Sequence, residues 1–326
     1  MTDVADVSRV ELEPQLEGHR IELTAYCYRM LGAAFEAEDA VQETFVRAWR
    51  ALDRFEGRSA FRSWLYRIAT NVCLDMLSAS QRRARPMDLT AVSTADKPLP
   101  AALPEATWIE PVPDRRVVPM GGDPADVAIA RESIRLAFIA ALQRLPPRQR
   151  AVLILCEVLR WHAAEVAELL GGSVASVNSA LQRARATLAA NREDTTAARP
   201  LDDEQRVLLD RYVDAFERYD MDSLTALLRQ DATWNMPPYD LWLQTHADIV
   251  QWCLGPGIGC QGSRLVATQA NGSPAFGQYK PALGGGYEPW SLQVLELDGD
   301  RIGGITFFLD TARFFPLFGL PLRLDA

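Results

Sequence analysis

The sequence predicts a multidomain protein in which two all-helical domains precede a C-terminal α+β domain. The chain has 326 residues, more than a single hydrophobic core usually organises. Its earlier part shows the apolar period of helices, interrupted by a proline-rich stretch, and its remainder adds strand-like runs. Apolar residues make up 48% of the chain, which is typical of folded domains and excludes a wholly disordered protein.

The first helical domain is expected at residues 16–83, after an N-terminal tail at residues 1–15. Apolar side chains recur at steps of three and four in segments 41–52 and 61–72, and residues 16–83 contain no proline. This pattern indicates amphipathic helices. Residues 84–125 contain eight prolines and little periodicity, which predicts an extended and only partly ordered linker.

The second helical domain is expected at residues 126–193. Within it a helix from Ala163 to Leu170 stops at a glycine pair, and Ser173 is placed to cap the next helix. A short glycine-containing turn between two helices is typical of a helix-turn-helix, whose second helix enters the DNA major groove. Segment 171–192 carries three arginines and no acidic residue, which favours DNA binding over an ordinary helical hairpin.

The candidate DNA-reading side chains lie on the exposed faces of that second helix. Val177, Leu181, Ala184 and Leu188 share one face and are expected to pack inward. The other faces carry polar side chains that can hydrogen-bond base edges or phosphates. The predicted set is Ser176, Asn178, Ser179, Gln182, Arg183 and Arg185.

After a hinge at residues 194–200, residues 201–326 predict the α+β domain. Helical runs at 204–219 and 221–228 precede strand-like runs that are separated by Asn-Gly and Asp-Gly turns. Helices followed by strands predict helices packed on an antiparallel sheet. This segment has 9 basic and 17 acidic side chains, so it supplies most of the net charge of −9.

The cysteines and histidines argue against a metal site or a disulfide framework. The five cysteines form no Cys-x-x-Cys pair and the three histidines lie far apart, so neither a metal nor another cofactor is expected. The scattered free thiols favour a reducing cytoplasm. No apolar run is long enough to span a membrane, and the acidic N-terminus is unlike a secretory signal.

Two blocks of the sequence resemble regions of bacterial sigma factors. Leu145-PPRQRAVL, with the helix-turn-helix and its Gln182-RAR ending, resembles sigma region 4, which reads the −35 promoter element. Tyr28-RMLG, Ala37-EDAVQETFVRAWRAL and Phe55-EGRSAFRSWLYRIATNVCLD resemble sigma region 2. Both regions in this order, without a region 3, are typical of the extracytoplasmic-function (ECF) sigma-70 family. The resemblance implies a region 2 helical bundle, a non-enzymatic role in promoter recognition and melting, and two partners: promoter DNA and the β′ and β subunits of the polymerase core.

The resemblance also implies two binding sets in region 2. A mostly acidic stripe suits a basic helical hairpin of the polymerase core, and it consists of Glu38, Asp39, Gln42 and Glu43. Arginines alternate with aromatic residues in segment 55–67, which suits an extruded base and the phosphates of a single strand. The predicted −10 set is Phe55, Arg58, Ser59, Phe61, Arg62, Arg67, Asn71, Asp75, Arg82 and Arg83, although the spacing of Phe61 and Trp64 also fits core positions. In region 4 the chain has Asn178 and Ala180 where the family often carries basic residues.

Residues 201–326 resemble the SnoaL-like domain, of the nuclear-transport-factor (NTF2) type, that is fused to sigma factors of the SigG/SigJ type. This resemblance implies a cone of helices on a curved sheet, with a pocket that could take a small apolar ligand and modulate the sigma factor. The predicted pocket set is Trp234, Met236, Tyr239, Trp242, His246, Tyr279, Trp290 and Phe307, with Trp252 as a further candidate. The candidate acid/base groups Asp240, His246, Glu288 and Asp310 show no diagnostic spacing.

Two alternative functions stay open from the sequence. A stand-alone helix-turn-helix regulator that senses a ligand would explain the last two domains but leaves residues 16–83 without a role. A SnoaL-like isomerase or hydrolase with a helical appendage would leave both helical domains unexplained. Only a sigma factor is expected to give promoter-specific transcription starts with core polymerase alone.

Overall fold

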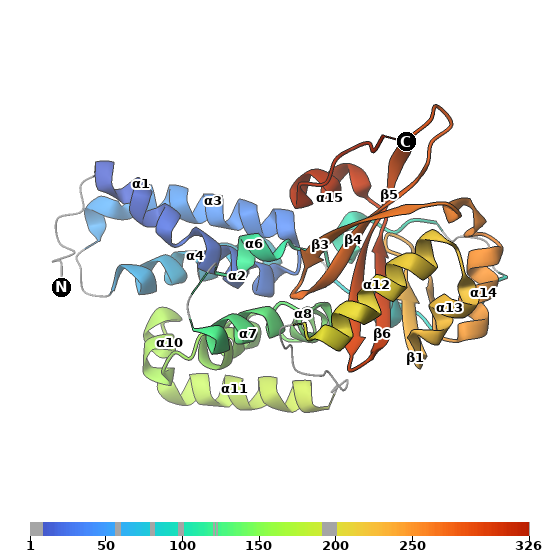
Figure 1. The fold of residues 1–326 in the computed structure, drawn as a ribbon. Helices are drawn as coiled ribbons and strands as arrows, with labels where there is room; N and C mark the ends of the chain where they lie inside the picture. Colours follow the sequence, from blue (N-terminus) through green and yellow to red (C-terminus); the bar gives the residue numbers. More distant parts are fainter. Residues whose placement is uncertain are drawn as a thin grey trace. The chain divides into compact units, whose positions relative to one another are not determined.

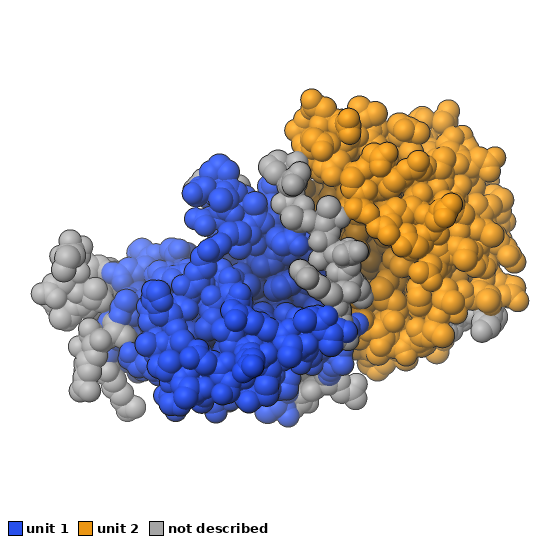
Figure 2. Space-filling view, turned by 90° about the horizontal axis from the view of Figure 1, so that it is seen from below, with its two compact units in different colours: residues 1–83, 115–195 blue, residues 84–114, 196–326 orange. Residues whose placement is uncertain are grey.

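The computed structural model describes residues 9–55, 60–78, 82–96, 101–119, 121, 123–190 and 201–325. The chain divides into two compact units (Figure 2). Residues 1–83 and 115–195 form the first unit, and residues 84–114 and 196–326 form the second. The segment between the two predicted helical domains is therefore divided between the units.

The first helical module of unit 1 contains four α-helices (Figure 1): α1 (Arg9–Gly18), α2 (Arg20–Leu31), α3 (Ala34–Ala51) and α4 (Phe61–Ser78), with a 3-10 turn η2 (Leu52–Arg54) after α3. Helix α2 ends at Gly32, whose φ of 74° is left-handed and favours glycine. Tyr26 and Leu65 are fully buried between the helices, and the Tyr26 hydroxyl lies 2.7 Å from the Thr70 hydroxyl. The expected helical bundle is therefore present.

The second helical module of unit 1 contains α7 (Pro124–Glu132), α8 (Leu136–Gln143), α9 (Pro147–Leu153), the π-helical turn η4 (Ile154–Val158), α10 (Ala163–Leu169) and α11 (Val174–Ala189). A short helix α6 (Asp114–Val117) precedes it. Ile139, Leu142 and Ile154 form part of its buried interior. Helices α10 and α11 pack together across the turn at Gly171, whose φ is 62°.

Two buried arginines connect the two helical modules within unit 1. Arg29 of α2 is 3% exposed and donates hydrogen bonds to the Ser133 hydroxyl at 2.7 and 3.1 Å. Arg150 of α9 is also 3% exposed, and it donates to the Met30 carbonyl of α2 and to the Gln143 carbonyl. Burial lowers the pKa of each guanidinium to about 10. The contact between the two modules therefore contains buried charge whose hydrogen bonds run to carbonyls and to a hydroxyl.

Unit 2 is built on a six-stranded sheet with the order β2-β1-β6-β5-β4-β3. The strands are β1 (Leu228–Asn235), β2 (Trp242–Leu243), β3 (Arg264–Ala270), β4 (Ser273–Pro281), β5 (Tyr287–Asp298) and β6 (Arg301–Phe308). The expectation of an antiparallel sheet is wrong in one respect: β1 and β6 run parallel, so the sheet is mixed. Asn271 and Gly272, with φ of 56° and 68°, turn the chain from β3 into β4, as the Asn-Gly signal predicts.

Helices cover both faces of this sheet. On one face lie α12 (Asp203–Glu217), α13 (Met221–Ala226) and α14 (His246–Leu254), followed by the 3-10 turn η5 (Ile258–Cys260); α15 (Thr311–Phe318) contacts β5 (Figure 1). Phe307 belongs to the core beneath α12–α14, whereas the next residue, Phe308, packs edge-on against Phe314 of α15. Successive side chains of a strand point to opposite faces, so the two faces of β6 serve two separate apolar layers.

Residues 84–114, named the strap below, belong to the sheet domain and contain two short helices, α5 (Pro86–Leu89) and η3 (Glu105–Thr107). Ala95 lies in the hydrophobic core of that domain. The Ser93 amide donates to the Trp242 carbonyl at 2.8 Å, and the Leu103 amide donates to the Pro238 carbonyl at 2.9 Å. The expectation of a partly ordered linker is therefore wrong for the described strap residues, because their polar and apolar groups find partners on the sheet domain.

The described helices include none that is both long enough and apolar enough to cross a membrane.

Candidate nucleic-acid interface and C-terminal cavities

Helix α11 presents the predicted DNA-reading set on its exposed faces. The Ser173 hydroxyl accepts a hydrogen bond from the Ser176 amide at 3.1 Å, so Ser173 caps α11 as predicted. Val177 and Ala184 are buried against the module, which fixes the rotation of the helix about its axis. All six predicted residues are exposed: Ser176, Asn178, Ser179, Gln182, Arg183 and Arg185.

One member of this set has an intramolecular partner. Arg185 forms an ion pair with Glu157 of η4, and its side chain keeps 61% exposure. The side chains of Gln182 and Arg183 are exposed, and no ion pair to either is found within the described part of the chain. The centre of α11 is therefore a surface of amide, hydroxyl and guanidinium groups, which are the groups that contact bases and phosphates in the major groove.

The predicted polymerase-binding stripe lies along α3, and its members differ in availability. Asp39 and Gln42 are exposed. Glu38 forms an ion pair with Arg116, and Glu43 accepts a hydrogen bond from Arg47 at 2.7 Å. Binding a basic partner there would require Glu38 and Glu43 to exchange these arginines for the cations of the partner.

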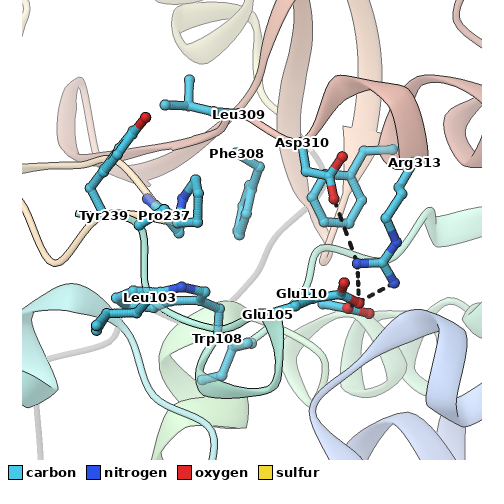
Figure 3. Close-up of a pocket in the computed structure, with 14 residues that line it drawn as sticks. Leu103, Glu105, Trp108, Glu110, Pro237, Tyr239, Phe308, Leu309, Asp310 and Arg313 are labelled. Carbon is cyan, nitrogen blue, oxygen red and sulfur yellow. Dashed lines mark hydrogen bonds and ion pairs between the residues drawn. The ribbon is translucent and has the colours of Figure 1, made fainter.

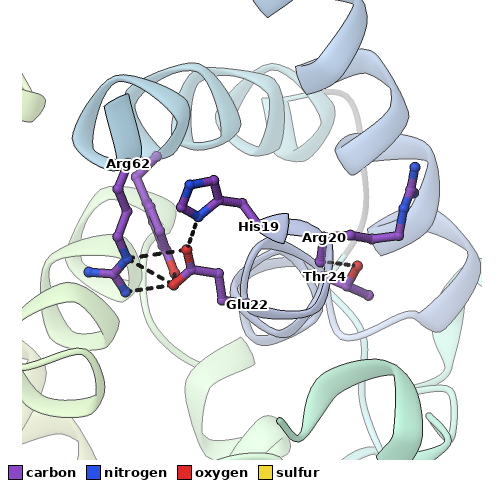
Figure 4. Close-up of polar contacts among 6 residues, drawn as sticks. His19, Arg20, Glu22, Thr24 and Arg62 are labelled. Carbon is purple, nitrogen blue, oxygen red and sulfur yellow. Dashed lines mark hydrogen bonds and ion pairs between the residues drawn. The ribbon is translucent and has the colours of Figure 1, made fainter. Parts of the chain in front are cut away.

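Arg62 of the predicted −10 set is held by the half-buried carboxylate of Glu22 (Figure 4). Glu22 of α2 accepts hydrogen bonds from Arg62 at 2.7 and 2.8 Å and lies 2.5 Å from Nδ1 of His19. Burial of Glu22 raises its pKa, but the hydrogen bonds from His19 and Arg62 outweigh this effect and lower the pKa to about 2. Glu22 is thus a constant negative charge that positions the Arg62 guanidinium over the ring of Tyr66.

The helix-turn-helix module contacts residues of the predicted −10 set. The Trp161 ring lies 5.1 Å from the Tyr66 ring and 5.6 Å from the Arg62 guanidinium. Arg67 donates to the Glu168 carbonyl at 3.4 Å. Two predicted DNA-binding arginines are therefore partly covered by the module that is predicted to read a different promoter element.

The other members of the −10 set occupy mixed environments. Asn71, Asp75 and Arg82 are exposed, and Asp75 accepts a hydrogen bond from Arg47 at 3.1 Å. Phe61 is 9% exposed and packs against the half-buried Phe55 and Trp64, which favours the core assignment of its ring. The expectation that Arg83 touches phosphate is wrong for this state, because Arg83 is 5% exposed and pairs with Glu36 at 2.6 Å. The remaining two members, Arg58 and Ser59, lie outside the described residues.

A cavity of about 150 Å³ lies beneath α13 and α14 in the sheet domain. Aromatic rings and methionines form most of its wall, and five of the eight predicted pocket residues line it: Trp234, Met236, Tyr239, Trp290 and Phe307, together with Trp252. Gln278 is the one amide of the lining, and it is already engaged with Ser263 at 3.0 Å and Ser291 at 2.8 Å.

Three predicted pocket residues lie elsewhere. The Trp242 indole donates to the Thr90 carbonyl of the strap at 3.0 Å, and His246 hydrogen-bonds the Arg229 carbonyl at 2.8 Å. Tyr279 is fully buried against Phe315 and donates to the Pro321 carbonyl. Tyr279 follows Gln278 in β4, so it points to the other face of the sheet. The pocket assignment of Trp242, His246 and Tyr279 is therefore wrong.

The candidate acid/base groups also lie away from the cavity. Its wall, as far as the structure describes it, holds no carboxylate and no imidazole. Glu288 pairs with Lys280 at 3.2 Å, and Asp310 lies beside Arg313 at 3.6 Å. A cavity with this lining can hold an apolar molecule but offers no group suited to moving a proton at pH 7.

A second pocket, of about 310 Å³, lies between the strap and the sheet domain (Figure 3). Leu103 and Trp108 of the strap face Pro237, Tyr239 and Phe308 of the domain across it. Tyr239 and Leu309 also line the first cavity.

An ion cluster closes one end of this second pocket. Arg313 pairs there with Glu105 and, at 3.3 Å, with the buried Glu110. Sequence reasoning missed this site because its residues are separated by some 130 to 210 positions and follow no local pattern.

Comparisons with known proteins fit the helical modules and the sheet domain. The family model of sigma-70 region 2 matches residues 16–83, and that of sigma-70 region 4 matches residues 135–188. The ECF RNA polymerase sigma factor SigG of Mycobacterium tuberculosis is 45% identical over 323 residues, which cover 97% of this chain and 86% of SigG. The probable ECF RNA polymerase sigma factor SigI of the same organism is 29% identical over 212 residues, 64% of each chain.

The crystal structure of the M. tuberculosis extracytoplasmic function sigma factor SigJ matches the fold along nearly the whole chain. It has a TM-score of 0.60 at 23% identity, and the match covers 95% of this chain and 99% of SigJ. The order of two helical modules and a mixed-sheet domain is therefore shared with a known fold, and the expected fold class is confirmed.

Proposed function

Because the chain belongs to the ECF family of RNA polymerase sigma factors, which bind core polymerase and promoter DNA, we propose specific roles for its surfaces. Helix α11 reads the −35 element, the exposed stripe of α3 binds the polymerase core, and the face of α4 around Arg62 and Arg67 engages the −10 strand. The sheet domain modulates these activities. The proposed setting is the cytoplasm, with the β′ and β subunits as the polymerase partners.

The observation that carries the −35 assignment is the segregation of α11 into two faces. Val177 and Ala184 are buried, whereas Gln182 and Arg183 are exposed. A helix that followed the glycine turn for packing alone would not need a surface without acidic residues. The assignment predicts that base-specific contact comes from Gln182, and that Arg183 binds either a guanine edge or a phosphate.

Run-off transcription with purified core polymerase tests this proposal. The full chain should start transcription at a defined site without other factors, and Gln182→Ala should reduce these starts about tenfold, in keeping with one base contact of about 1–3 kcal/mol. Arg206→Ala is the matched control, because Arg206 is an exposed arginine of α12 with a local partner, Asp203. Wild-type activity of Gln182→Ala would overturn the −35 assignment, and absence of any specific start would overturn the sigma-factor mechanism for this chain.

The cavity beneath α13 and α14 supports a ligand-sensing role in place of an enzymatic one. Its volume of about 150 Å³ is that of a cavity able to hold one small ring compound. Since the described wall has no charged group, burying an ionised ligand there would leave its charge unpaired. The proposed ligand class is therefore small, uncharged and apolar.

Paired probes of similar shape test the ligand class on the full chain. Toluene at millimolar concentration should raise the melting temperature of the sheet domain, whereas benzoate at the same concentration should leave it unchanged. Equal effects of the two probes, or no effect of toluene, would contradict the proposed ligand class.

A further inference from the structure

The strap closes on itself as well as on the sheet domain. The Ala84 amide donates to the Thr107 carbonyl at 2.8 Å, and the Ile109 amide donates to the Ala84 carbonyl at 3.2 Å. Ala84 and Trp108 thereby form a parallel bridge. The chain leaves the first helical module at Arg83, runs through a loop of two dozen residues, and returns to within one strand spacing of its starting point.

A second set of contacts fastens the returning end of the strap to the β3–β4 turn. The Val112 amide donates to the Asn271 side-chain carbonyl at 3.0 Å, and the Asn271 amide donates to the Val112 carbonyl at 3.0 Å. The Gly272 amide donates to the Asp114 carboxylate at 2.8 Å. Trp108, Ile109 and Val112 are each less than 5% exposed, so polar and apolar contacts act together along this stretch.

From this closure we propose that the sheet domain sets the length of the tether between the two DNA-binding modules, and so the promoter spacing that the protein accepts. This inference rests on the proposed function, since it requires the two modules to reach the −10 and −35 elements together. The controlling feature is the bridge between Ala84 and Trp108, which removes the intervening chain from the tether.

The number of residues in the linker gives the change in tether length. From Arg83 to Asp123, where the second module begins, an unclasped chain of 40 peptide steps spans at most about 135 Å at roughly 3.4 Å per step. With the bridge closed, Ala84 and Trp108 lie about 5 Å apart. Only the 15 steps from Trp108 to Asp123 then remain, which add at most about 50 Å. Docking of the strap therefore shortens the tether from about 135 Å to about 55 Å.

Promoter geometry makes this difference matter. Elements centred about 35 and about 10 base pairs upstream lie about 85 Å apart on DNA, at about 3.4 Å per base pair. Compact modules of this size have a radius of roughly 14 Å each, so the tether must cover about 55–60 Å. The docked tether, at full extension, is only about as long as this required distance. Helix α6 shortens it further because a helix rises only about 1.5 Å per residue. The released tether exceeds the requirement about twofold.

Two insertions of the same six Gly/Ser residues test the proposal in the full-length chain. An insertion between Gly121 and Gly122 lengthens the tether outside the closed loop by up to about 20 Å. An insertion between Asp96 and Lys97 adds the same length inside the loop. If the linker were free, both insertions would change the accepted promoter spacing equally. If the bridge between Ala84 and Trp108 is closed, only the insertion after Gly121 changes it.

The readout is run-off transcription from promoters whose spacer is lengthened one base pair at a time. The insertion after Gly121 should extend the longest accepted spacer by up to about six base pairs, at about 3.4 Å per base pair, so transcription at three extra base pairs should exceed that of the wild type. The insertion after Asp96 should leave the spacer profile of the wild type unchanged. Equal profiles for the two insertion variants, whether shifted or unshifted, would overturn the proposal.

A substitution that weakens the contact between the strap and the β3–β4 turn gives an independent measurement. Asn271→Gly keeps the left-handed turn but removes the side-chain acceptor of the Val112 amide, and it should increase hydrogen exchange in the strap and broaden the accepted spacer range. Arg264→Met is the matched control, because Arg264 pairs with Glu217 of α12 and not with the strap. Faster strap exchange with an unchanged spacer profile would also overturn the proposal, whereas loss of all specific starts in the wild type would overturn the proposed function itself.

Discussion

Replacing Arg29 by methionine should strengthen the contact between the helical modules of unit 1. The fall of the Arg29 pKa from 12.5 to about 10 on burial corresponds to about 3 kcal/mol that disfavours the charged form. At pH 7 the guanidinium stays charged, so the folded state bears this cost. Methionine removes the charge and retains an unbranched side chain that fills the same space.

The hydrogen bonds that Arg29 makes reduce the expected gain. Donation to the Ser133 hydroxyl at 2.7 and 3.1 Å contributes about 1.5–3 kcal/mol, as is usual for a charged donor. The Ser133 hydroxyl still donates to the Ala130 carbonyl at 2.9 Å, so Arg29→Met leaves it satisfied. The net expectation is a gain of about 1 kcal/mol in the free energy of opening.

Arg29→Lys is the matched variant, and it is expected to lower the free energy of opening where Arg29→Met raises it. Lysine keeps the buried charge but lacks the planar fork that reaches Ser133 twice, so it should lose about 1–2 kcal/mol. Native-state hydrogen exchange of the α2 and α8 amides measures the local opening free energy in each variant, without requiring that the whole chain unfolds in one step. The reasoning is refuted if Arg29→Met exchanges faster than Arg29→Lys.

Three further outcomes follow from single residues. The low pKa of Glu22 contributes stability that is present above pH ~4.5 and is lost as the pH falls towards about 2. Glu22→Gln should therefore cost roughly 2 kcal/mol at pH 7 and nothing at pH 2 in urea unfolding, whereas Glu17→Gln, which removes an exposed pair, should change little at either pH. Ser173→Ala should lower the stability of α11 by about 1 kcal/mol, seen as faster amide exchange in its first turn. Arg183→Ala should reduce the salt dependence of promoter binding by a slope of about 1 if Arg183 contacts a phosphate, and by less if it reads a base.

The features that the sequence predicted correctly are local ones. The cap at Ser173, the inward face of α11 and the Asn271–Gly272 turn each depend on residues within a few positions of one another. Chain geometry over such distances is set by backbone dihedrals and the helical period, so a single sequence carries the information. Trp234, Met236 and Phe307, which the resemblance implies as pocket residues, line the cavity beneath α13 and α14.

The features that the sequence could not predict depend on contacts between distant segments. Arg83 looks like a phosphate ligand until Glu36 is placed beside it, and Tyr279 looks like a pocket residue until β4 fixes which face it occupies. The strap is the clearest case. Its prolines indicate an extended chain, which is correct for much of the backbone, but only the folded sheet domain supplies the acceptors at Trp242 and Pro238 that dock it.

The chemistry between the helical modules of unit 1 suits an arrangement that must come apart. Opening an apolar interface costs about 25 cal/mol of free energy for each Å² of apolar surface exposed. Apolar groups form no hydrogen bonds with water that would offset this cost. Here Arg29 regains its hydration when the modules separate, and the Met30 carbonyl exchanges the Arg150 guanidinium for water. The charges that specify the closed arrangement thus also lower the cost of leaving it. A sigma factor whose modules bind separate promoter elements needs both properties, and we expect polymerase and DNA binding to supply the opening energy.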